Sequence, residues 1–179
     1  MIQLIQGLDD TIIKFVYDHL HTPVLDKIMI FITSLGNIGT IWIALTLLFL
    51  LFKQTRKLGA LLAFGLILEL FICDGILKNI FQRPRPFTRF DVEMLVPAPR
   101  SFSFPSGHTA SSFTAALIIF SQDKKIGVFA LILATLIGFS RIYLFCHYPT
   151  DVLAGIVLGI IITFVSIKAF KFYESKARA

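Results

Sequence analysis

The stretch from residue 78 to residue 151 holds three short polar clusters, each beside a long apolar run. They read KNIFQRPRP at residues 78–86, PSGH at residues 105–108, and SR at residues 140–141 followed by His147 and Asp151. Together they supply one lysine, several arginines, two histidines and one carboxylate. Such groups are costly near a membrane, so their concentration in an apolar chain indicates a functional site.

Composition places the chain among the integral membrane proteins. It has 179 residues, of which 56% are hydrophobic, and its mean hydropathy is +0.80. Several apolar runs approach the roughly 20 residues that a bilayer-spanning helix needs. The net charge of +6 does not favour nucleic-acid binding, because the basic residues lie between apolar segments and not on one soluble face. We expect no cleavable signal peptide, since charged residues interrupt the first twenty positions.

Residues 1–36 are predicted to form interfacial or re-entrant helices outside the spanning core. The pattern over residues 2–20 is amphipathic and favours a helix that lies in the membrane interface. Four charged residues stand between its apolar positions: Asp9, Asp10, Lys14 and Asp18. The three aspartates disfavour the alternative, a first membrane span. Residues 24–35 predict a short re-entrant or tilted helix, and one long helix from about residue 28 to 52 is the alternative.

Five apolar segments predict an all-α, polytopic membrane helix bundle over residues 38–172, with six spans if the N-terminal region also crosses. The predicted spans are residues 38–52, 58–80, 106–121, 126–145 and 151–172. We interpret residues 1–179 as one membrane domain that ends in a basic cytoplasmic tail at residues 173–179. Gly155 and Gly159 predict close packing of the last helix against a neighbour.

The basic residues divide between the two membrane faces. The positive-inside rule places one set in the cytoplasm: Lys53, Arg56, Lys57, Lys124, Lys125, Lys168, Lys171, Lys176 and Arg178. The opposite set lies in or near the polar clusters: Lys78, Arg83, Arg85, Arg89, Arg100 and Arg141. A functional site formed by the clusters explains why this second set of basic residues lies on the other face. We therefore expect the clusters to face outward and the C-terminus to be cytoplasmic. Short turns between antiparallel helices then bring the clusters together.

Lys78, Arg85 and Arg141 predict a pocket of three cations. Such a pocket repels itself unless an anion fills it, and guanidinium forks match phosphate oxygens in two-point fashion. Each side chain alone could equally extend toward lipid headgroups. Three of them beside two histidines favour a phosphate site.

Ser106 and Gly107 begin a predicted helix whose free N–H groups favour an anion, and a plain helix cap is the alternative. His108 adds a group that can protonate a leaving oxygen. His147 and Asp151 are four residues apart, so the carboxylate can fix the imidazole tautomer and leave the other ring nitrogen free to attack. An ordinary hydrogen-bonded pair is the alternative for these two.

No metal site is predicted, because a third and fourth ligand at usable spacing are missing from the His–Asp pair. Cys73 and Cys146 are interpreted as buried thiols. Asp74 is expected to pair with Lys78, and for Glu69 structural hydrogen bonding is favoured over catalysis.

These motifs resemble the three signatures of the type 2 phosphatidic acid phosphatase superfamily, which also contains vanadium haloperoxidases and bacterial acid phosphatases. The signatures are Lys-x6-Arg-Pro, Pro-Ser-Gly-His and Ser-Arg-x5-His-x3-Asp. Residues 78–151 match every position of these signatures. The resemblance implies that His147 attacks phosphorus, Asp151 orients it, and His108 protonates the leaving oxygen and then activates water. It also implies that the phosphate is bound by five residues without a metal or cofactor: Lys78, Arg85, Ser106, Gly107 and Arg141.

The resemblance further implies a lipid phosphatase of the cell membrane, with undecaprenyl diphosphate as the favoured substrate. Phosphatidylglycerophosphate or phosphatidate is the runner-up. Two other classes stay open: a phosphotransferase acting from lipid to another acceptor, and a non-catalytic phospholipid-binding protein. Arg83, Arg89 and Arg100 are expected either to touch the substrate headgroup or to face water.

Overall fold

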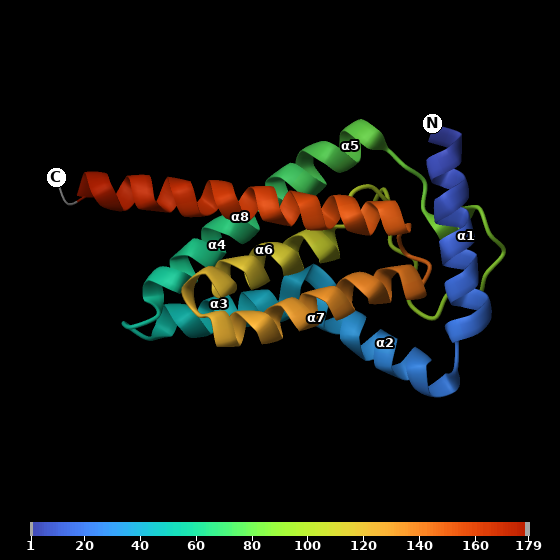
Figure 1. The fold of residues 1–179 in the computed structure, drawn as a ribbon, viewed down its shortest axis with the longest axis horizontal. Coiled ribbons are helices and arrows are strands. Elements are labelled where there is room, and N and C mark those ends of the chain that lie inside the picture. The colour runs from blue at the N-terminus through green and yellow to red at the C-terminus, as the bar shows by residue number, and fades with distance from the viewer. Residues whose placement is uncertain (1, 178–179) are drawn as a thin grey trace.

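The computed structural model describes residues 2–177 and folds them into helices, with no β-strand in that range (Figure 1). The elements in chain order are α1 (Ile2–Leu20), α2 (Pro23–Gly36), η1 (Asn37–Gly39), α3 (Thr40–Leu51), α4 (Arg56–Leu70), η2 (Phe71–Leu77), α5 (Lys78–Phe81), η3 (Pro86–Thr88), α6 (Gly107–Gln122), α7 (Lys124–Tyr143) and α8 (Pro149–Ala177). The predicted all-α helix bundle is therefore confirmed.

Helix α6 lies in the middle of the bundle, packed against α4, α7 and α8 (Figure 1). Many of its buried side chains are small, among them Ala110, Ser112, Ala115 and Ala116. Small side chains let helix backbones approach closely in a membrane, where lipid tails compete for the same apolar contacts. Because α6 begins at the PSGH cluster, its central position places that cluster inside the bundle.

Gly155 and Gly159 lie where α8 meets α6. A Cβ atom at Gly155 would stand 2.8 Å from the carbonyl oxygen of Ser106, and one at Gly159 would stand 3.0 Å from that of Ala110. The predicted close approach of the last helix is thus present, and its partner is α6. This contact also holds the start of α8 against the start of α6.

Within residues 2–177, four helical segments are long and apolar enough to cross a membrane. They are Pro23–Leu51, Arg56–Thr88, Lys124–Tyr143 and Pro149–Lys176. Pro23–Leu51 joins the short helix expected at residues 24–35 to the span expected at residues 38–52. This segment is close to the alternative of one long helix from about residue 28 to 52. Helix α6, expected as a span over 106–121, has 16 residues and is shorter than these four segments.

The first of these segments is broken at residues 38 and 39. Ile38 has a φ of 53° and Gly39 a φ of 68°, both in the left-handed region. That region is strained for a β-branched residue. The Ile38 side chain is 92% exposed, so its own packing does not hold the break in place. The break separates α2 from α3 directly beside α6.

Helix α1 lies across the end of the bundle where α7 stops and α8 starts (Figure 1). It is not among the four candidate spans. Its inner face carries the buried residues Ile13 and Val16. One detail of the sequence interpretation is wrong: Asp9, expected among the polar positions of an interfacial helix, is only 1% exposed and belongs to this inner face.

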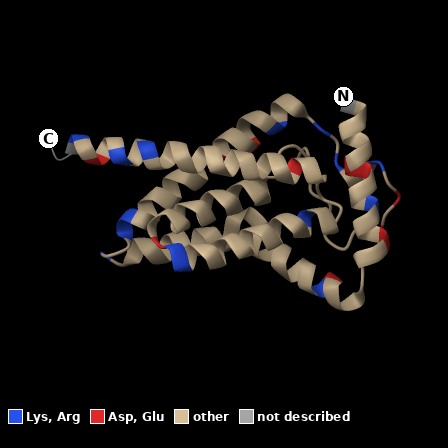
Figure 2. Cartoon of the chain, viewed as in Figure 1, with Lys and Arg blue, Asp and Glu red and all other residues tan. Residues whose placement is uncertain are grey.

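Basic residues predominate at the end of the bundle away from α1 (Figure 2). They occupy the α3–α4 turn, the α6–α7 turn and the distal part of α8, where Asp123 and Glu174 are the acidic residues, whereas acidic residues are more frequent at the opposite end. Helix α8 continues to Ala177, so residues 173–177 of the expected tail are helical. Residues 178 and 179, including the predicted cytoplasmic Arg178, lie outside the described residues.

Candidate active site

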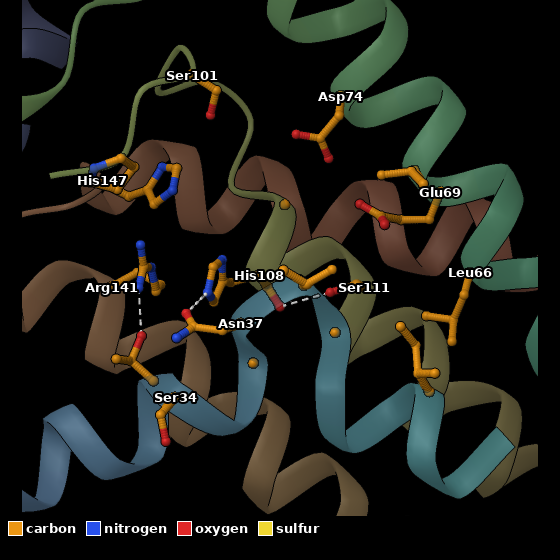
Figure 3. Close-up of a pocket in the computed structure, with 18 of the residues that line it drawn as sticks. Ser34, Asn37, Leu66, Glu69, Asp74, Ser101, His108, Ser111, Arg141 and His147 are labelled. Atoms are coloured by element: carbon orange, nitrogen blue, oxygen red, sulfur yellow. Dashed lines mark hydrogen bonds between the residues drawn. The ribbon is translucent and has the colours of Figure 1, made fainter. Parts of the chain in front are cut away.

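The three polar clusters meet at one cavity of about 950 Å³. Residues from all three line it: Lys78, Arg85, Gly107, His108, Arg141 and His147. Figure 3 shows His108, Arg141 and His147 reaching one space from separate segments. Ser106 and Asp151 are fully buried and bond to each other through the backbone, Ser106 N–H donating to the Asp151 carbonyl at 3.1 Å. The predicted convergence of the site residues is therefore present in the structure.

His147 lies in the connection between α7 and α8 with both ring nitrogens facing charged groups. Its Nδ1 is 3.6 Å from Asp151 Oδ2, slightly longer than a hydrogen bond. Its Nε2 accepts a hydrogen bond from Arg85 Nη1 at 3.1 Å. This arrangement fits a proton on Nδ1 and a lone pair on Nε2. Burial lowers the pKa of His147 to about 3 despite the neighbouring Asp151, so the ring is neutral at pH 7.

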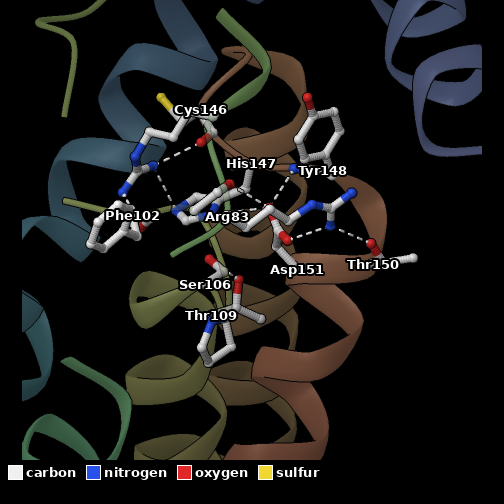
Figure 4. Close-up of polar contacts among 12 residues, drawn as sticks. Arg83, Phe102, Ser106, Thr109, Cys146, His147, Tyr148, Thr150 and Asp151 are labelled. Atoms are coloured by element: carbon white, nitrogen blue, oxygen red, sulfur yellow. Dashed lines mark hydrogen bonds and ion pairs between the residues drawn. The ribbon is translucent and has the colours of Figure 1, made fainter. Parts of the chain in front are cut away.

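Asp151 is held by a network of donors in addition to His147 (Figure 4). Arg83 Nη1 donates to Oδ1 at 2.7 Å, and the Tyr148 N–H donates to Oδ2 at 2.9 Å. The Ser103 hydroxyl donates to Oδ2 as well. A carboxylate with this many donors stays ionised and keeps one orientation. Asp151 is thus fixed mainly by these other donors, and His147 Nδ1 lies 3.6 Å from its Oδ2.

Arg83 connects this carboxylate to helix α1, a role that the sequence did not reveal. Its Nη2 donates to Gln6 Oε1 and to Asp9 Oδ2, each at 2.7 Å. Asp9 also accepts from the Thr150 backbone N–H at 3.0 Å. The guanidinium carbon of Arg83 lies 4.1 Å from the ring centroid of Tyr148. Arg83 is thus not among the residues that line the cavity; its side chain is 19% exposed and bridges two buried carboxylates.

Arg85 and Arg141 present their guanidinium groups from fixed positions. Arg85 donates to the Cys146 carbonyl at 2.7 Å and to the carbonyls of Ser101 and Phe102 at 2.7 and 3.1 Å. Arg141 Nη1 donates to the Thr33 hydroxyl of α2. Its Nε is buried and finds no hydrogen-bond partner among the described residues. An unsatisfied buried donor in a cationic cavity is a ready contact for an anion.

The start of α6 faces the same cavity. Ser106 precedes the helix but its hydroxyl makes no capping bond; Oγ instead accepts from Thr109 Oγ1 at 2.9 Å. The helix-cap alternative therefore does not describe this side chain. A Cβ at Gly107 would stand 3.2 Å from Asp74 Oδ2 and 3.4 Å from Lys78 Nζ, so glycine keeps space open beside the lysine. His108 Nε2 lies 3.0 Å from Asn37 Oδ1.

Two acidic residues stand at the side of the cavity. Lys78 Nζ bonds to Asp74, which confirms the expected pair within one helix turn. Glu69 lines the cavity, and its Oε1 has no hydrogen-bond partner among the described residues. The possible ligand atoms of Glu69, Cys73 and Asp74 lie within 4.8 Å of one another. The distances among these atoms would allow the group to bind a cation, but the Lys78 ammonium already neutralises Asp74.

The remaining sequence candidates lie outside the cavity lining. Arg89 is largely exposed and pairs with Asp10 of α1 at 3.4 Å. Arg100 is exposed. Cys73 and Cys146 are free and buried, as expected.

Comparison with known proteins decides the family. Residues 58–174 match the model of the PAP2 superfamily. The chain belongs to this superfamily. An undecaprenyl-diphosphatase of Sulfolobus acidocaldarius is 33% identical over 146 residues, which cover 80% of this chain and 70% of that protein. The region that matches the family model includes all three polar clusters.

Solved structures agree with this assignment. LpxE of Aquifex aeolicus superimposes with a TM-score of 0.80 at 31% identity, covering 90% of this chain and 95% of that one. The transmembrane PAP2-type phosphatidylglycerolphosphate phosphatase of Bacillus subtilis gives a TM-score of 0.75 at 28% identity, covering 97% and 87%. The present PAP2 chain is accordingly a membrane lipid phosphatase.

Proposed function

We propose that this PAP2 phosphatase removes the terminal phosphate of undecaprenyl diphosphate at the extracytoplasmic membrane surface through a phosphohistidine. The observation that carries the proposal is the His147 geometry: a buried, neutral imidazole with Asp151 at Nδ1 and its Nε2 directed to the cationic cavity. A nucleophile, an orienting carboxylate and oxyanion donors in one place are the parts that phosphoryl transfer needs.

In the first step, His147 Nε2 forms a bond to the terminal phosphorus as the bridging P–O bond breaks. Lys78, Arg85 and Arg141 bind the phosphoryl oxygens, and the free Nε–H of Arg141 supplies one such donor. His108 gives a proton to the leaving oxygen, so that undecaprenyl phosphate departs. Asp151 balances the positive charge that develops on the His147 ring.

In the second step, water attacks the phosphohistidine. His108, now unprotonated, takes a proton from this water as the new P–O bond forms. The N–P bond breaks, His147 is neutral again, and inorganic phosphate leaves. The proton that His108 gives up in the first step is regained in the second. The mechanism needs no metal ion, because fixed cations provide the charge that magnesium would supply.

The shape of the cavity supports a lipid substrate. Beyond the cationic part, its lining is largely apolar and includes Ile43, Leu47, Leu66 and Ile67 of α3 and α4. Three of these, Ile43, Leu47 and Ile67, are also exposed. An apolar wall that continues from a phosphate site to the lipid-facing side of the bundle suits a headgroup whose chain stays in the bilayer.

The distribution of charge supports an outward-facing site. The basic α3–α4 and α6–α7 turns lie at the end of the bundle opposite the cavity. The positive-inside rule assigns that end to the cytoplasm. Phosphatidylglycerophosphate is the second candidate substrate, because the B. subtilis relative that covers 97% of this chain acts on that class of lipid according to its name.

A phosphate-release panel tests the proposed substrate. Purified protein in detergent is given undecaprenyl diphosphate, undecaprenyl phosphate, phosphatidylglycerophosphate and phosphatidate, each without added acceptor. We expect kcat/KM to be highest for the polyprenyl diphosphate, since a diphosphate presents more anionic oxygens to the cations. A preference for phosphatidylglycerophosphate would select the second candidate, and release only after an acceptor is added would identify a phosphotransferase.

Chelation tests the metal-free mechanism. We expect the rate of phosphate release to be unchanged in excess EDTA, because Lys78, Arg85 and Arg141 already supply the positive charge. The same assay with added MgCl₂ and CaCl₂ is the control. Loss of activity in EDTA that magnesium restores would rule out this mechanism and direct attention to the Glu69–Cys73–Asp74 group.

A further inference from the structure

We propose that Asn37 is a positioning residue that sets the tautomer and orientation of His108, the acid–base group of the reaction. Asn37 Oδ1 lies 3.0 Å from His108 Nε2. An amide oxygen only accepts, so this contact requires the proton to be on Nε2. Figure 3 shows the opposite edge of the ring facing the side of the cavity where His147 lies. Nδ1 is therefore the nitrogen that exchanges a proton with substrate and water.

The break between α2 and α3 brings Asn37 to this position. Asn37 is the first residue after α2, and the two left-handed residues Ile38 and Gly39 follow it immediately. A strained, exposed isoleucine is not explained by packing, and such strain is typical of places where backbone geometry serves function. The break places the Asn37 amide at the cavity wall while the chain continues into α3.

The end of α2 is also fitted closely to His108. A Cβ at Gly36 would stand 3.0 Å from His108 Cδ2 and 2.9 Å from Ile137 Cγ2. Glycine at position 36 thus lets the imidazole lie against the helix end, with the Asn37 amide beyond it. Residues 36 and 37 precede the region 58–174 that matches the family model, so the family signatures carry no information about this support.

The chemistry of both steps benefits from this contact. When His108 is protonated, Nε2–H stays bonded to Asn37 and Nδ1–H is directed to the leaving oxygen. After that proton has been given up, Nε2–H remains bonded and the lone pair on Nδ1 is ready for the attacking water. Asn37 therefore does for the acid–base histidine what Asp151 does for the nucleophile. This inference rests on the proposed function, in which His108 transfers these protons.

Replacement of Asn37 tests the role through activity. We expect Asn37→Ala to lower kcat about 10- to 100-fold with little change in KM, a part of the ~10²–10⁴-fold that general acid–base catalysis contributes. Asn37→Asp keeps the acceptor and adds a negative charge. It is expected to recover most of kcat and to move the limb of the pH–rate profile governed by His108 to higher pH, because a carboxylate favours the protonated ring.

The other groups around His108 stay the same in these variants. They are Arg141 of α7, His147 after α7, Lys78 of α5 and Arg85 before η3, with Glu69 and Asp74 in the lining of the same cavity. Thr40→Ala is the matched control. Among the described residues, the Thr40 hydroxyl bonds to the Asn37 backbone carbonyl, so this change removes a contact beside the break and leaves the Asn37 amide in place. Its kcat and pH profile are expected to match the wild type.

The tautomer itself provides a readout that needs no activity. The chain has four histidines, and the ¹⁵N signals of His108 in detergent micelles can be assigned by their loss in His108→Gln. We expect the Nε2–H tautomer in the wild type and a mixture of tautomers in Asn37→Ala. An unchanged tautomer, or a pH profile of Asn37→Asp that equals the wild type, overturns the inference. Absence of phosphate release by the wild type would instead count against the proposed function.

Discussion

His147→Ala is expected to abolish phosphate release while leaving substrate binding nearly intact. Without the imidazole, no Nε2 attacks phosphorus, and loss of a nucleophile typically lowers kcat by about 10⁴-fold or more. The cations Lys78, Arg85 and Arg141 remain in the cavity and still bind the diphosphate. The measurements are phosphate release and equilibrium binding of radiolabelled undecaprenyl diphosphate to protein in nanodiscs.

The control for this variant is another histidine, His19, which is exposed on α1. His19→Ala is expected to keep the wild-type rate. Wild-type protein quenched with alkaline detergent should also carry a phosphoryl group that is labile to acid, stable to base and absent from His147→Ala. If His147→Ala turns over normally, the phosphohistidine mechanism is wrong, and if the wild type itself has no activity, the non-catalytic lipid-binding alternative returns.

Arg83→Ala is expected to impair both folding and catalysis. The change leaves Asp9 and Asp151, which are 1% and 0% exposed, as buried carboxylates without their shared cation. Removal of one partner from a buried ion pair costs about 3–5 kcal/mol. Since Asp151 would also lose a donor that orients it toward His147, we expect kcat to fall as well, on the order of 10²-fold or more. Thermal unfolding in detergent and kcat are measured on the same preparations.

Arg89 provides a matched control for this change. It is also an arginine of the loop between α5 and α6, and it also reaches an aspartate of α1, but its pair with Asp10 is longer, at 3.4 Å, and its side chains are 42% and 25% exposed. Exposed pairs contribute little to stability, so Arg89→Ala should be close to wild type. Arg83→Lys should recover only part of the loss, because the Arg83 guanidinium donates to four side chains, those of Gln6, Asp9, Thr150 and Asp151, and an ammonium cannot bridge them as a planar guanidinium does. Equal effects of Arg83→Ala and Arg89→Ala would refute the bridging role.

The sequence predicted that the three polar clusters meet, because their residues stand at helix ends. Once Lys78, His108, Arg141 and His147 are assigned to the ends of successive antiparallel helices, short connections leave them one place to meet. Apolar run lengths predicted the bundle for a similar reason, since a membrane constrains length and composition together.

The supporting contacts were missed because they depend on how α1 and α2 approach the bundle. No motif relates Asp9 to Arg83, or Asn37 to His108, across 74 and 71 positions. One signal was present for Asp9: it precedes Ile13 by four residues and Val16 by seven, so all three share a helix face. An aspartate on the apolar face of a helix indicates a buried partner. For Asn37, the sequence offered only its position after Gly36, at the end of a predicted helix.

The crosswise position of α1 has a consequence for how the enzyme is made. Asp9 is synthesised before its partners, because Arg83 follows 74 residues later and Thr150 141 residues later. Until those residues have emerged and the last helices have inserted, the Asp9 carboxylate has no cation and is most stable in water at the membrane surface. The contacts that hold Asp9 of α1 against the end of the bundle can therefore form only after the chain has been synthesised beyond the start of α8.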